Sequence, residues 1–360
     1  MPTSSVEIIM GAIFSYLGLI GDNEYFYLIA EVGFLYLMFL AGMEVDLKRI
    51  LNSPKKIIEK SILFLSLMVF FSITLGALFA LNPIIIISMP LISIGLLATL
   101  SKTYDKESAW LQLAFAIGVM GEIVSIAALT VFDVAISTGF TLDLVTKLAY
   151  LLFFIVIVYL IYKLLHLLFW WFPELKKKLV PKLDIADQDV RLSMSLFFIL
   201  IAVMLSLGLE LALGTFIAGV AISTFFHHEK RLEEKMSSLG FGFLVPLFFI
   251  HVGASFDLAS LLIEGVVTGA LLITALMILS RVLASFVLRD IHGQKNAFLV
   301  AVSLSMPLTL LVAVATIGYE TKLLDQLSYY QLILASILEI LISMMSIKML
   351  HKSINQKPLG

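Results

Sequence analysis

Long apolar runs, separated by short clusters of charged residues or of Pro, Gly and Asn, follow one another along the whole chain. A helix of about 20 apolar residues is long enough to cross a bilayer and satisfies its own backbone hydrogen bonds there. The clusters divide the chain into twelve predicted helices, at residues 4–20, 25–44, 57–81, 84–101, 108–132, 143–169, 190–207, 209–226, 236–253, 258–288, 295–318 and 328–350. With 61% hydrophobic and 14% charged residues, the composition excludes an ordinary soluble domain. We therefore predict an all-α polytopic membrane protein.

The charge balance and the cysteine count narrow the functional classes further. A net charge of −2 argues against a nucleic-acid partner, and the absence of cysteine excludes disulfides and thiolate metal sites. No cofactor and no catalytic residue is expected. The first helix lacks a basic segment followed by a small-residue cleavage site, so no cleavable signal peptide is expected. Residues 351–360 read as a short cytoplasmic tail.

Lysine and arginine are distributed unevenly between the predicted loops. With a cytoplasmic N-terminus, 21 of the 24 basic residues lie on the cytoplasmic side, Lys147 and Lys322 lie outside, and Arg281 lies within a helix. Because cytoplasmic loops are enriched in Lys and Arg, we expect both termini in the cytoplasm and the chain in the inner (plasma) membrane.

Short segments of the first part of the chain return, in the same order, in the last part. The matched segments are IMGAIFS (9–15) with IAGVAIS (217–223), GMEVDL (42–47) with GASFDL (253–258), and SMPLISIGLLA (88–98) with SMPLTLLVAVA (305–315). The offset of the last pair, 217 residues, also carries Glu122 onto Glu339. We predict two five-helix repeats, residues 1–133 and 209–350, joined by two connector helices in 134–208. Seven helices separate equivalent elements, so the repeats are inverted, as in many secondary transporters.

Pro90 and Pro307 occupy equivalent positions inside the fourth and eleventh predicted helices. Proline removes a backbone hydrogen bond and clashes with the preceding turn. Paired interruptions of this kind indicate discontinuous helices beside a binding site at the middle of the membrane, where freed carbonyls and half-helix ends coordinate ions. The alternative is a pair of kinks without a functional role.

Glu122 is the only charged residue in the run from 108 to 132, and it lies near the middle of that run. An ionisable residue at this depth in a membrane is expensive and usually faces a wet cavity where it handles ions or protons. The alternative is a protonated carboxyl group that forms a hydrogen bond between helices.

Several segments resemble those of the monovalent cation:proton antiporters, in the Kef-type and bacterial Na⁺/H⁺ exchanger branch. They are FLYLMFLAGMEVDLKRI (34–50), ISIGLLATLSK (92–102), VMGEIVSI (119–126), TFIAGVAIS (215–223) and VPLFFIHVGASFDL (245–258). The resemblance covers nearly the whole chain. It implies the sodium/proton antiporter fold, with inverted repeats and broken helices 4 and 11. It further implies exchange of Na⁺ or K⁺ for H⁺ by alternating access, a core of helices 3–5 and 10–12 that moves against a scaffold, and a homodimer.

The chain also departs from the pattern of this family. Gly121 stands at the position of the family's first acidic residue, and Glu122 stands at that of the second, which is usually aspartate. Ile92 and Ser93 replace the usual Thr-Ser pair, and Arg281 replaces a lysine. The family commonly has thirteen helices, so the chain looks short by one N-terminal helix, either truly or through a misplaced start. The nucleotide-binding domain that often follows the helices in Kef-type proteins is not expected here.

An antiporter needs one group that binds either a proton or a cation, with each occupied form able to cross the membrane. Glu122 is the candidate for this group, as a transient ligand of the monovalent cation. Ser93, Ser125 and carbonyls of the broken helix would supply oxygen ligands suited to Na⁺ or K⁺. With Gly121 in place of a second acid, the exchange is expected to be electroneutral.

Arg281 and Glu339 are two further charges within the predicted helices. Arg281 either compensates buried negative charge or extends to the nearby membrane surface. For Glu339 three roles are open: salt partner of Arg281, second proton site, or neutral hydrogen-bond donor between helices. We favour the salt partner. His251, near the end of helix 9, reads as a packing residue rather than a sensor.

Two other functions compete with exchange. A transport-inactive membrane subunit or sensor would retain the fold, and the missing first acid and short N-terminus favour that interpretation. A symporter for a small organic anion is supported only by the positive charge of Arg281. In all three cases the bilayer is the surrounding solvent.

Overall fold

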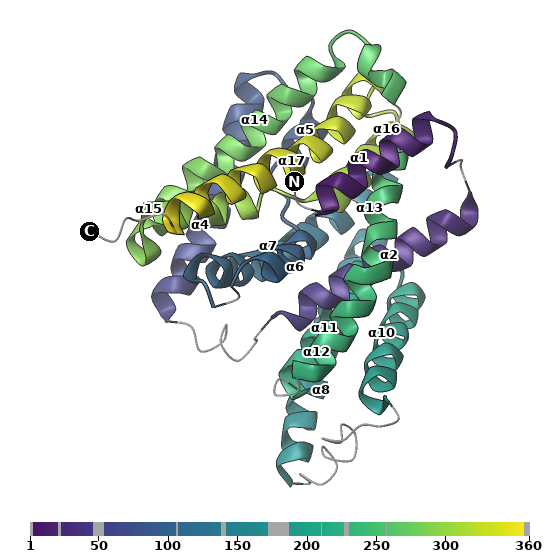
Figure 1. Ribbon diagram of the computed structural model, residues 1–360. Coiled ribbons are helices and arrows are strands. Elements are labelled where there is room, and N and C mark those ends of the chain that lie inside the picture. The colour runs from purple at the N-terminus through teal and green to yellow at the C-terminus, as the bar shows by residue number, and fades with distance from the viewer. Residues whose placement is uncertain are drawn as a thin grey trace. The chain divides into compact units, whose positions relative to one another are not determined.

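The chain is almost entirely helical in the computed structural model (Figure 1), which describes residues 3–20, 23–45, 54–105, 107–137, 142–171, 187–209, 211–226, 230–256 and 258–355. No strand occurs within these ranges. The chain forms two compact units, each described by itself below. Unit 1 contains Met1–Ala30, Asn52–Ser125 and Pro246–Gly360, and unit 2 contains Glu31–Leu51 and Ile126–Val245. Each unit therefore draws on both predicted repeats.

Seven helices of the described chain are long and apolar enough to cross a bilayer, and a bent pair, Gly293–Ser303 with Leu308–Tyr319, makes eight if it is one span. Three shorter apolar helices add to these: Val6–Tyr16, Leu152–Leu164 and Leu211–Phe225. Each of the twelve predicted segments contains helix. The prediction of an all-α polytopic membrane protein is confirmed.

Unit 1 is built around α14, whose buried side chains recur every three or four residues. In Figure 1, α14 runs beside α17 and also packs against α4. The hydroxyl of Thr274 in α14 donates a hydrogen bond to the carbonyl of Ala335 in α17 at 3.2 Å. The helices of unit 1 are α1 (Thr3–Tyr16), the start of α2 (Glu24–Met43), α4 (Lys55–Leu78), α5 (Pro83–Ser88), α6 (Gly95–Thr103), α7 (Ala109–Ser137) as far as Ser125, α13 (Val245–Ala254), α14 (Val266–Ser285), α15 (Arg289–Ser303), α16 (Leu308–Glu320) and α17 (Gln326–Asn355).

Unit 1 holds the predicted core helices and also α1 and α13, which the resemblance assigns to the scaffold. Direct contacts with other helices of unit 1 explain why α1 belongs to this unit. It crosses α13 closely, and the hydroxyl of Ser4 in α1 donates to the sulfur of Met344 in α17 at 3.4 Å. The assignment of these two helices to the scaffold therefore differs from the packing of the structure.

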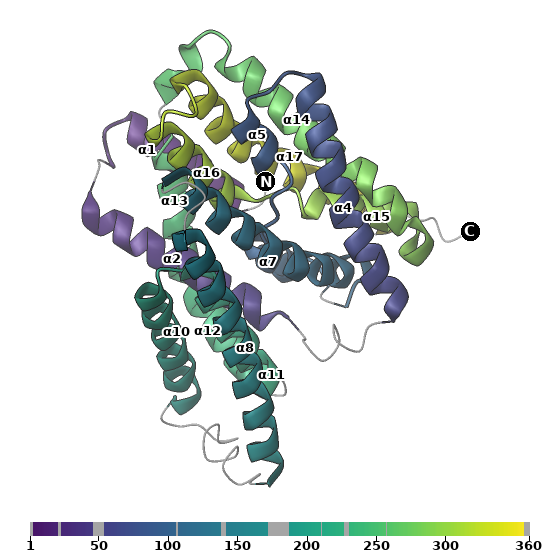
Figure 2. The ribbon, with the colours of Figure 1, turned by 180° about the vertical axis from the view of Figure 1, so that it is seen from behind.

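Unit 2 contains the rest of α2 and the end of α7, from Ile126. Its other helices are α8 (Leu142–Trp171), α10 (Gln188–Leu207), α11 (Leu211–Phe226) and α12 (Lys230–Leu239), labelled in Figure 2. Its core contains the rings of Tyr36, Phe39 and Phe197, whose centroids lie 5.6 to 5.8 Å apart. The Tyr36 hydroxyl donates to the carbonyl of Met236 at 3.0 Å, which satisfies its buried polar group. After α12, a π-helical turn, Gly240–Leu244, leads toward α13.

Two helix pairs approach so closely that only glycine fits. In unit 1, Gly11 of α1 and Gly253 of α13 each face a backbone carbonyl of the other helix, and an added Cβ would collide with it. In unit 2, Gly42 of α2 and Gly219 of α11 do the same. In the predicted repeat, Gly11 corresponds to Gly219 and Gly42 to Gly253. The two crossings are therefore equivalent under that repeat.

The fourth and eleventh predicted helices are both broken. The first break separates α5, which ends at Ser88, from α6, which begins at Gly95. The second separates α15 from α16, whose axes are bent by 42°. Pro90 lies in the first break and Pro307 directly precedes α16. The prediction of two discontinuous helices is confirmed, because proline cannot donate the hydrogen bond that would continue either helix.

Some predicted boundaries are wrong. The sequence predicts the tenth helix from residue 258, whereas a short 3₁₀ turn (Leu258–Leu262) comes first and α14 begins at Val266. Gly265, with φ of 89°, adopts a left-handed conformation that ends the preceding turn. The last helix extends to Asn355, so part of the predicted tail is helical, and residues 356–360 lie outside the described chain.

Candidate ion-binding site

The first break packs against one face of α7. Gly118 and Gly121 make this approach feasible, since they leave room for side chains of the break. A Cβ on Gly121 would lie 2.7 Å from Cδ1 of Ile92, and one on Gly118 would lie 2.5 Å from Cγ2 of Ile94. Both distances are shorter than ordinary carbon contacts. Glycine at these two positions therefore lets the non-helical segment lie directly on α7.

The same face of α7 binds the backbone of the break. The carboxylate of Glu122 accepts a hydrogen bond from the N–H of Ile94 at 2.8 Å, and the hydroxyl of Ser125 accepts one from the N–H of Ile92, also at 2.8 Å. Glu122 is only 1% exposed. Ile94 directly precedes α6, so the carboxylate lies at the N-terminal, electropositive end of this half-helix. The hydrogen bond and the helix end stabilise a negative charge on Glu122, whereas surrounding hydrocarbon would not.

The guanidinium of Arg281 binds the same segment. Its Nη2 donates to the carbonyl of Leu91 at 2.7 Å, and its Nη1 donates to the carbonyl of Met277 at 3.0 Å and to Oε1 of Glu339 at 3.1 Å. Arg281 and Glu339 are both completely buried. Pairing of Arg281 with Glu339, the alternative that we favoured, is the arrangement found. Extension of Arg281 to the membrane surface is excluded.

The buried ion pair is not fully satisfied. Within the described chain, Nε of Arg281 and Oε2 of Glu339 have no hydrogen-bond partner. Burying polar atoms in this way is costly, and native proteins tolerate few such atoms. Because the charge of Arg281 is already paired, the symport of an organic anion loses the one feature that supported it.

The second break reaches the same neighbourhood. The hydroxyl of Ser343 in α17 donates to the carbonyl of Ser305, at 3.1 Å, within the segment between α15 and α16. Cδ2 of Leu304 lies 3.4 Å from the position of a Cβ on Gly118. Gly118 of α7 thus touches residues from both breaks, and the two broken helices meet at α7.

Most of the predicted site residues make side-chain hydrogen bonds at the first break, and Ser93 is located by its place in the chain and its burial. Glu122, Ser125, Arg281 and Glu339 all make hydrogen bonds at or beside the first break. Ser93 is buried and lies between the two residues whose N–H groups α7 binds. The structure therefore brings these side chains around one non-helical segment.

Part of the site consists of backbone atoms that side-chain patterns do not reveal. The carbonyl of Leu91 and the N–H groups of Ile92 and Ile94 are the partners of the charged and polar side chains. One signal in the sequence does point to them. Gly118 and Gly121 lie three residues apart and on the same helical face as Glu122, a spacing that indicates close approach of another segment.

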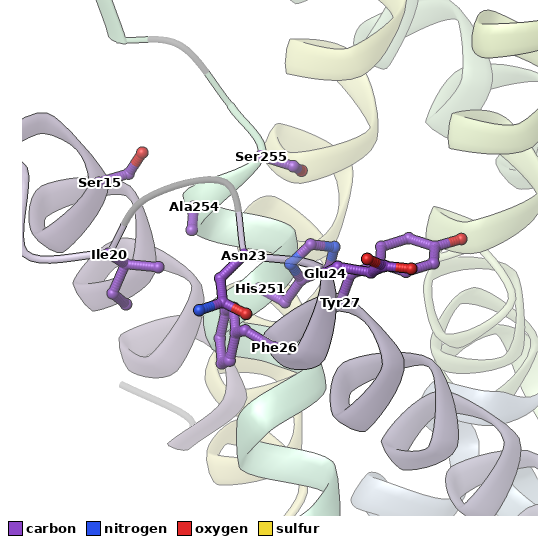
Figure 3. Close-up of a pocket in the computed structure, with 9 residues that line it drawn as sticks. All are labelled: Ser15, Ile20, Asn23, Glu24, Phe26, Tyr27, His251, Ala254 and Ser255. Atoms are coloured by element: carbon purple, nitrogen blue, oxygen red, sulfur yellow. The ribbon is translucent and has the colours of Figure 1, made fainter.

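A separate cavity of about 490 Å³ lies where α1 ends, α2 begins and α13 ends (Figure 3). The imidazole of His251 lines it and packs edge to face on the rings of Phe26 and Tyr27, with centroids 5.5 and 5.6 Å away. Glu24 provides a carboxylate at its rim. These ring contacts agree with the prediction that His251 is a packing residue. None of the predicted ion-site residues lines this cavity.

Three proteins named as Na⁺/H⁺ antiporters are similar to this chain in sequence. The chain is 25% identical to the putative Na⁺/H⁺ antiporter YjbQ of Bacillus subtilis (strain 168), over 98% of this chain and 59% of the relative. It is 28% identical to the probable Na⁺/H⁺ antiporter GerT of Bacillus cereus, over 69% of this chain and 64% of the relative. It thus spans less than two thirds of these two proteins. An Enterococcus hirae Na⁺/H⁺ antiporter is 24% identical over 98% of this chain and 93% of its own.

The fold is that of a solved sodium proton antiporter. The structure of MjNhaP1 from Methanocaldococcus jannaschii superposes with a TM-score of 0.73 and 15% sequence identity, covering 100% of this chain and 93% of the other. A second structure of the same protein, at pH 8, gives a TM-score of 0.68. The family described as "Sodium/hydrogen exchanger, transmembrane" matches residues 1–352. The chain is a multi-pass membrane protein and belongs to the sodium/hydrogen exchanger family.

Proposed function

We propose that this protein is a secondary transporter that exchanges a monovalent cation, Na⁺ or K⁺, for H⁺ by alternating access. The observation that carries the proposal is the buried carboxylate of Glu122, held by a backbone N–H at the start of a half-helix in a broken span. Its relatives are named Na⁺/H⁺ antiporters, which favours Na⁺ as the first cation to test.

In this proposal Glu122 is the group for which the cation and the proton compete. The Ile94 N–H holds the carboxylate in place while its charge is neutralised by one or the other. Ser93, Ser125 and carbonyls of the first break provide neutral oxygen ligands, which suit a monovalent cation. Neutralisation removes the cost of moving a bare carboxylate through a low-dielectric environment.

Arg281 and Glu339 would compensate charge without taking part in the exchange. Arginine does not lose its proton in proteins, and the neighbouring carboxylate balances its charge. The Arg281 guanidinium also fixes the Leu91 carbonyl, and hence the segment that faces Glu122. Since only Glu122 changes its occupancy, one positive charge moves in each direction and the exchange is electroneutral.

The proposed setting is the inner (plasma) membrane, with both termini in the cytoplasm. The uneven distribution of Lys and Arg supports this orientation. The inverted repeats, residues 1–133 and 209–350 around the connector 134–208, are supported by the equivalent glycine crossings. A homodimer through scaffold helices completes the proposal. A purely monomeric species in native mass spectrometry, at physiological lipid composition, would contradict it.

The test is exchange in everted membrane vesicles that have been acidified and loaded with a dye that reports ΔpH. Addition of Na⁺, K⁺ or Li⁺ should restore the fluorescence of the dye, because cation entry drives proton exit. The matched control is Glu122→Gln, which keeps the size of the side chain and removes its charge. No response to any of these cations between pH 6 and pH 9 would reject the proposal.

The alternative is a transport-inactive subunit or sensor that retains the fold. The relatives, which are named Na⁺/H⁺ antiporters, do not favour this alternative. The two functions separate in one experiment. A sensor would bind Na⁺ or K⁺ in purified form and give no exchange in vesicles, whereas an antiporter gives both.

A further inference from the structure

The cavity at the ends of α1 and α13 and the start of α2 is separate from the residues of the first break, and the proposed exchange does not use it. Its volume of about 490 Å³ lies in the range of pockets that hold small organic ligands. All of its described lining residues belong to unit 1. The cavity is therefore formed within one packed unit, and its lining indicates which ligand it suits.

The charges around the cavity favour a cation. Glu24 is the one carboxylate among the described lining residues, and neither Lys nor Arg is among them. Ser15 lies in the last turn of α1 and Ala254 in the last turn of α13, so two helices present their negative ends to the cavity. The positive end of α2 is capped by the side chain of Asn23, which accepts a hydrogen bond from the N–H of Tyr25 at 2.9 Å.

The polar atoms of the lining favour a ligand that donates hydrogen bonds. The hydroxyl of Ser255 donates to the carbonyl of Val252 at 2.9 Å, so its oxygen is left to accept from a ligand. The ionised carboxylate of Glu24 is likewise only an acceptor. A primary ammonium group has three N–H donors, whereas a quaternary ammonium group has none. Among organic cations, the lining therefore suits a primary ammonium.

Aromatic rings provide the apolar wall of the cavity (Figure 3). The imidazole of His251 packs edge to face with the rings of Phe26 and Tyr27, at centroid distances of 5.5 and 5.6 Å. These mutual contacts hold the three rings in place. Aromatic rings attract cations through their π electrons and also pack against the carbon atoms next to an ammonium group.

Exposed tyrosines stand beside the cavity. Tyr16 directly follows the lining residue Ser15, and Tyr25 lies between the lining residues Glu24 and Phe26. The side chains of both tyrosines are exposed. Tyrosine is enriched at the level of the lipid headgroups, and in the proposed orientation this level is that of the outer leaflet. An ammonium group at this depth belongs either to a lipid headgroup or to an amine dissolved in the external water.

We propose that this cavity is a binding site for a primary ammonium group. The carboxylate of Glu24 pairs with its charge, the oxygen of Ser255 accepts one of its hydrogen bonds, and the ring wall packs against its alkyl part. Phosphatidylethanolamine and ethanolamine carry the same group, and the experiment separates these two sources. The site is independent of the proposed ion site, because none of the residues assigned to that site lines the cavity.

The experiment uses ligands that differ only in the methyl groups on nitrogen. The full chain in detergent is titrated with phosphatidylethanolamine or phosphatidylcholine of the same acyl chains, and the bound lipid is measured by native mass spectrometry. In a second series, thermal unfolding is followed with ethanolamine or choline. The variants are Glu24→Gln and Ser255→Ala. The matched control is Glu264→Gln, which removes an exposed carboxylate that does not line the cavity.

The parent protein should bind the primary ammonium about threefold to fivefold more tightly than its quaternary counterpart, as expected for an ion pair at a partly exposed rim. Glu24→Gln should lose this preference and Ser255→Ala should reduce it, whereas Glu264→Gln should keep it. A preference for phosphatidylethanolamine without a response to ethanolamine identifies a lipid headgroup as the ligand. A higher unfolding temperature with ethanolamine, and not with choline, identifies a water-soluble amine.

Two results would overturn the inference. One is equal binding of the two lipids together with equal effects of ethanolamine and choline. The other is a preference that persists in Glu24→Gln, since the ammonium group would then bind elsewhere. Glu24 and Ser255 are exposed, so both variants should unfold like the parent protein when no ligand is added. Neither series measures exchange, so a failure of the proposed function would leave this inference standing.

Discussion

At the scale of single residues, the site depends on which atom of each side chain meets which backbone group. Glu122 and Ser125 act as acceptors for N–H groups that a continuous helix would have satisfied internally. Arg281 acts as the donor for a freed carbonyl. The break is therefore stable because three side chains replace the missing backbone partners. Two of these three residues, Glu122 and Arg281, are ionisable, so the backbone of the break is held in part by charged groups.

Removal of the Glu122 carboxylate should abolish exchange. Glu122→Gln and Glu122→Ala are expected to fall to the background of empty vesicles, because neither can bind a proton or a cation through a charge. Glu122→Asp keeps the carboxylate, about one methylene shorter, and should retain part of the activity with a changed apparent cation affinity. The measurement is ΔpH-dye recovery across a range of Na⁺ concentrations.

The matched control for this series is Glu24→Gln. Glu24 is an exposed carboxylate at the start of α2, outside the group of residues at the first break. It should retain exchange. Wild-type activity in Glu122→Ala would show that the ion-binding carboxylate lies elsewhere in the chain.

Breaking the buried ion pair on one side should destabilise the protein strongly. Glu339→Gln and Arg281→Met each leave one buried charge without its partner, at a cost of about 3 to 5 kcal/mol. The double variant Arg281→Met/Glu339→Met removes both charges and should be more stable than either single variant. Thermal unfolding in detergent measures all three. A double variant less stable than both single variants would contradict this account of the pair.

At the scale of elements, the helices cross where glycine permits backbone contact. α1 crosses α13 at Gly11 and Gly253, and α2 crosses α11 at Gly42 and Gly219. In a membrane, close packing of helices and van der Waals contact replace the hydrophobic effect between helices. The positions of these crossings therefore depend more on four missing side chains than on the many apolar ones around them.

Alanine at any of these four glycines should loosen its crossing. The new Cβ would meet a backbone carbonyl, which cannot turn aside as a flexible side chain can, so the two helices must separate. The expected loss is about 1 to 3 kcal/mol of stability, typical of overpacking. Gly242→Ala is the matched control, since a Cβ there meets no atom within 4 Å. Its thermal unfolding should equal that of the parent protein, and equal losses in all five variants would refute the argument.

The sequence predicted the broken helices well and their environment only in part. Two prolines in equivalent places sufficed to locate both breaks, because proline has a fixed effect on a helix. Glu122 was found as a lone charge in an apolar run. The pairing of Arg281 with Glu339 was predicted, but the backbone partners of Glu122 and Arg281 were not. They are the N–H of Ile94 and the carbonyl of Leu91, and every residue carries the same backbone groups. Which of them lose their helical partners is a property of the packed structure.

At the scale of the whole molecule, the chain consists of two compact units, and each contains parts of both predicted repeats. Unit 1 carries Glu122, both breaks and the ion pair. In the proposed function, the ion held by Glu122 and the charges that compensate it would therefore belong to one packed unit. The boundaries of the units follow from long-range packing, which local sequence patterns do not encode.

Exchange by the whole protein should be indifferent to the membrane potential. In the proposed mechanism only Glu122 changes its occupancy, so the moving charge is the same in both directions. Proteoliposomes with and without a K⁺–valinomycin potential should therefore give equal rates of Na⁺-driven proton movement. The control is Glu339→Gln. If the parent protein produces current, and this variant still exchanges Na⁺ for H⁺ but produces none, Glu339 is a second proton site and the exchange is electrogenic.

The glycine crossings also govern the order in which the protein can be assembled. Each crossing joins a helix made early in synthesis to one made much later: α1 to α13, and α2 to α11. The first two helices thus leave the ribosome and enter the bilayer well before their partners exist. Until then the glycine faces of α1 and α2 lack the helices that they contact in the folded protein. Maturation of both units therefore waits for the second repeat.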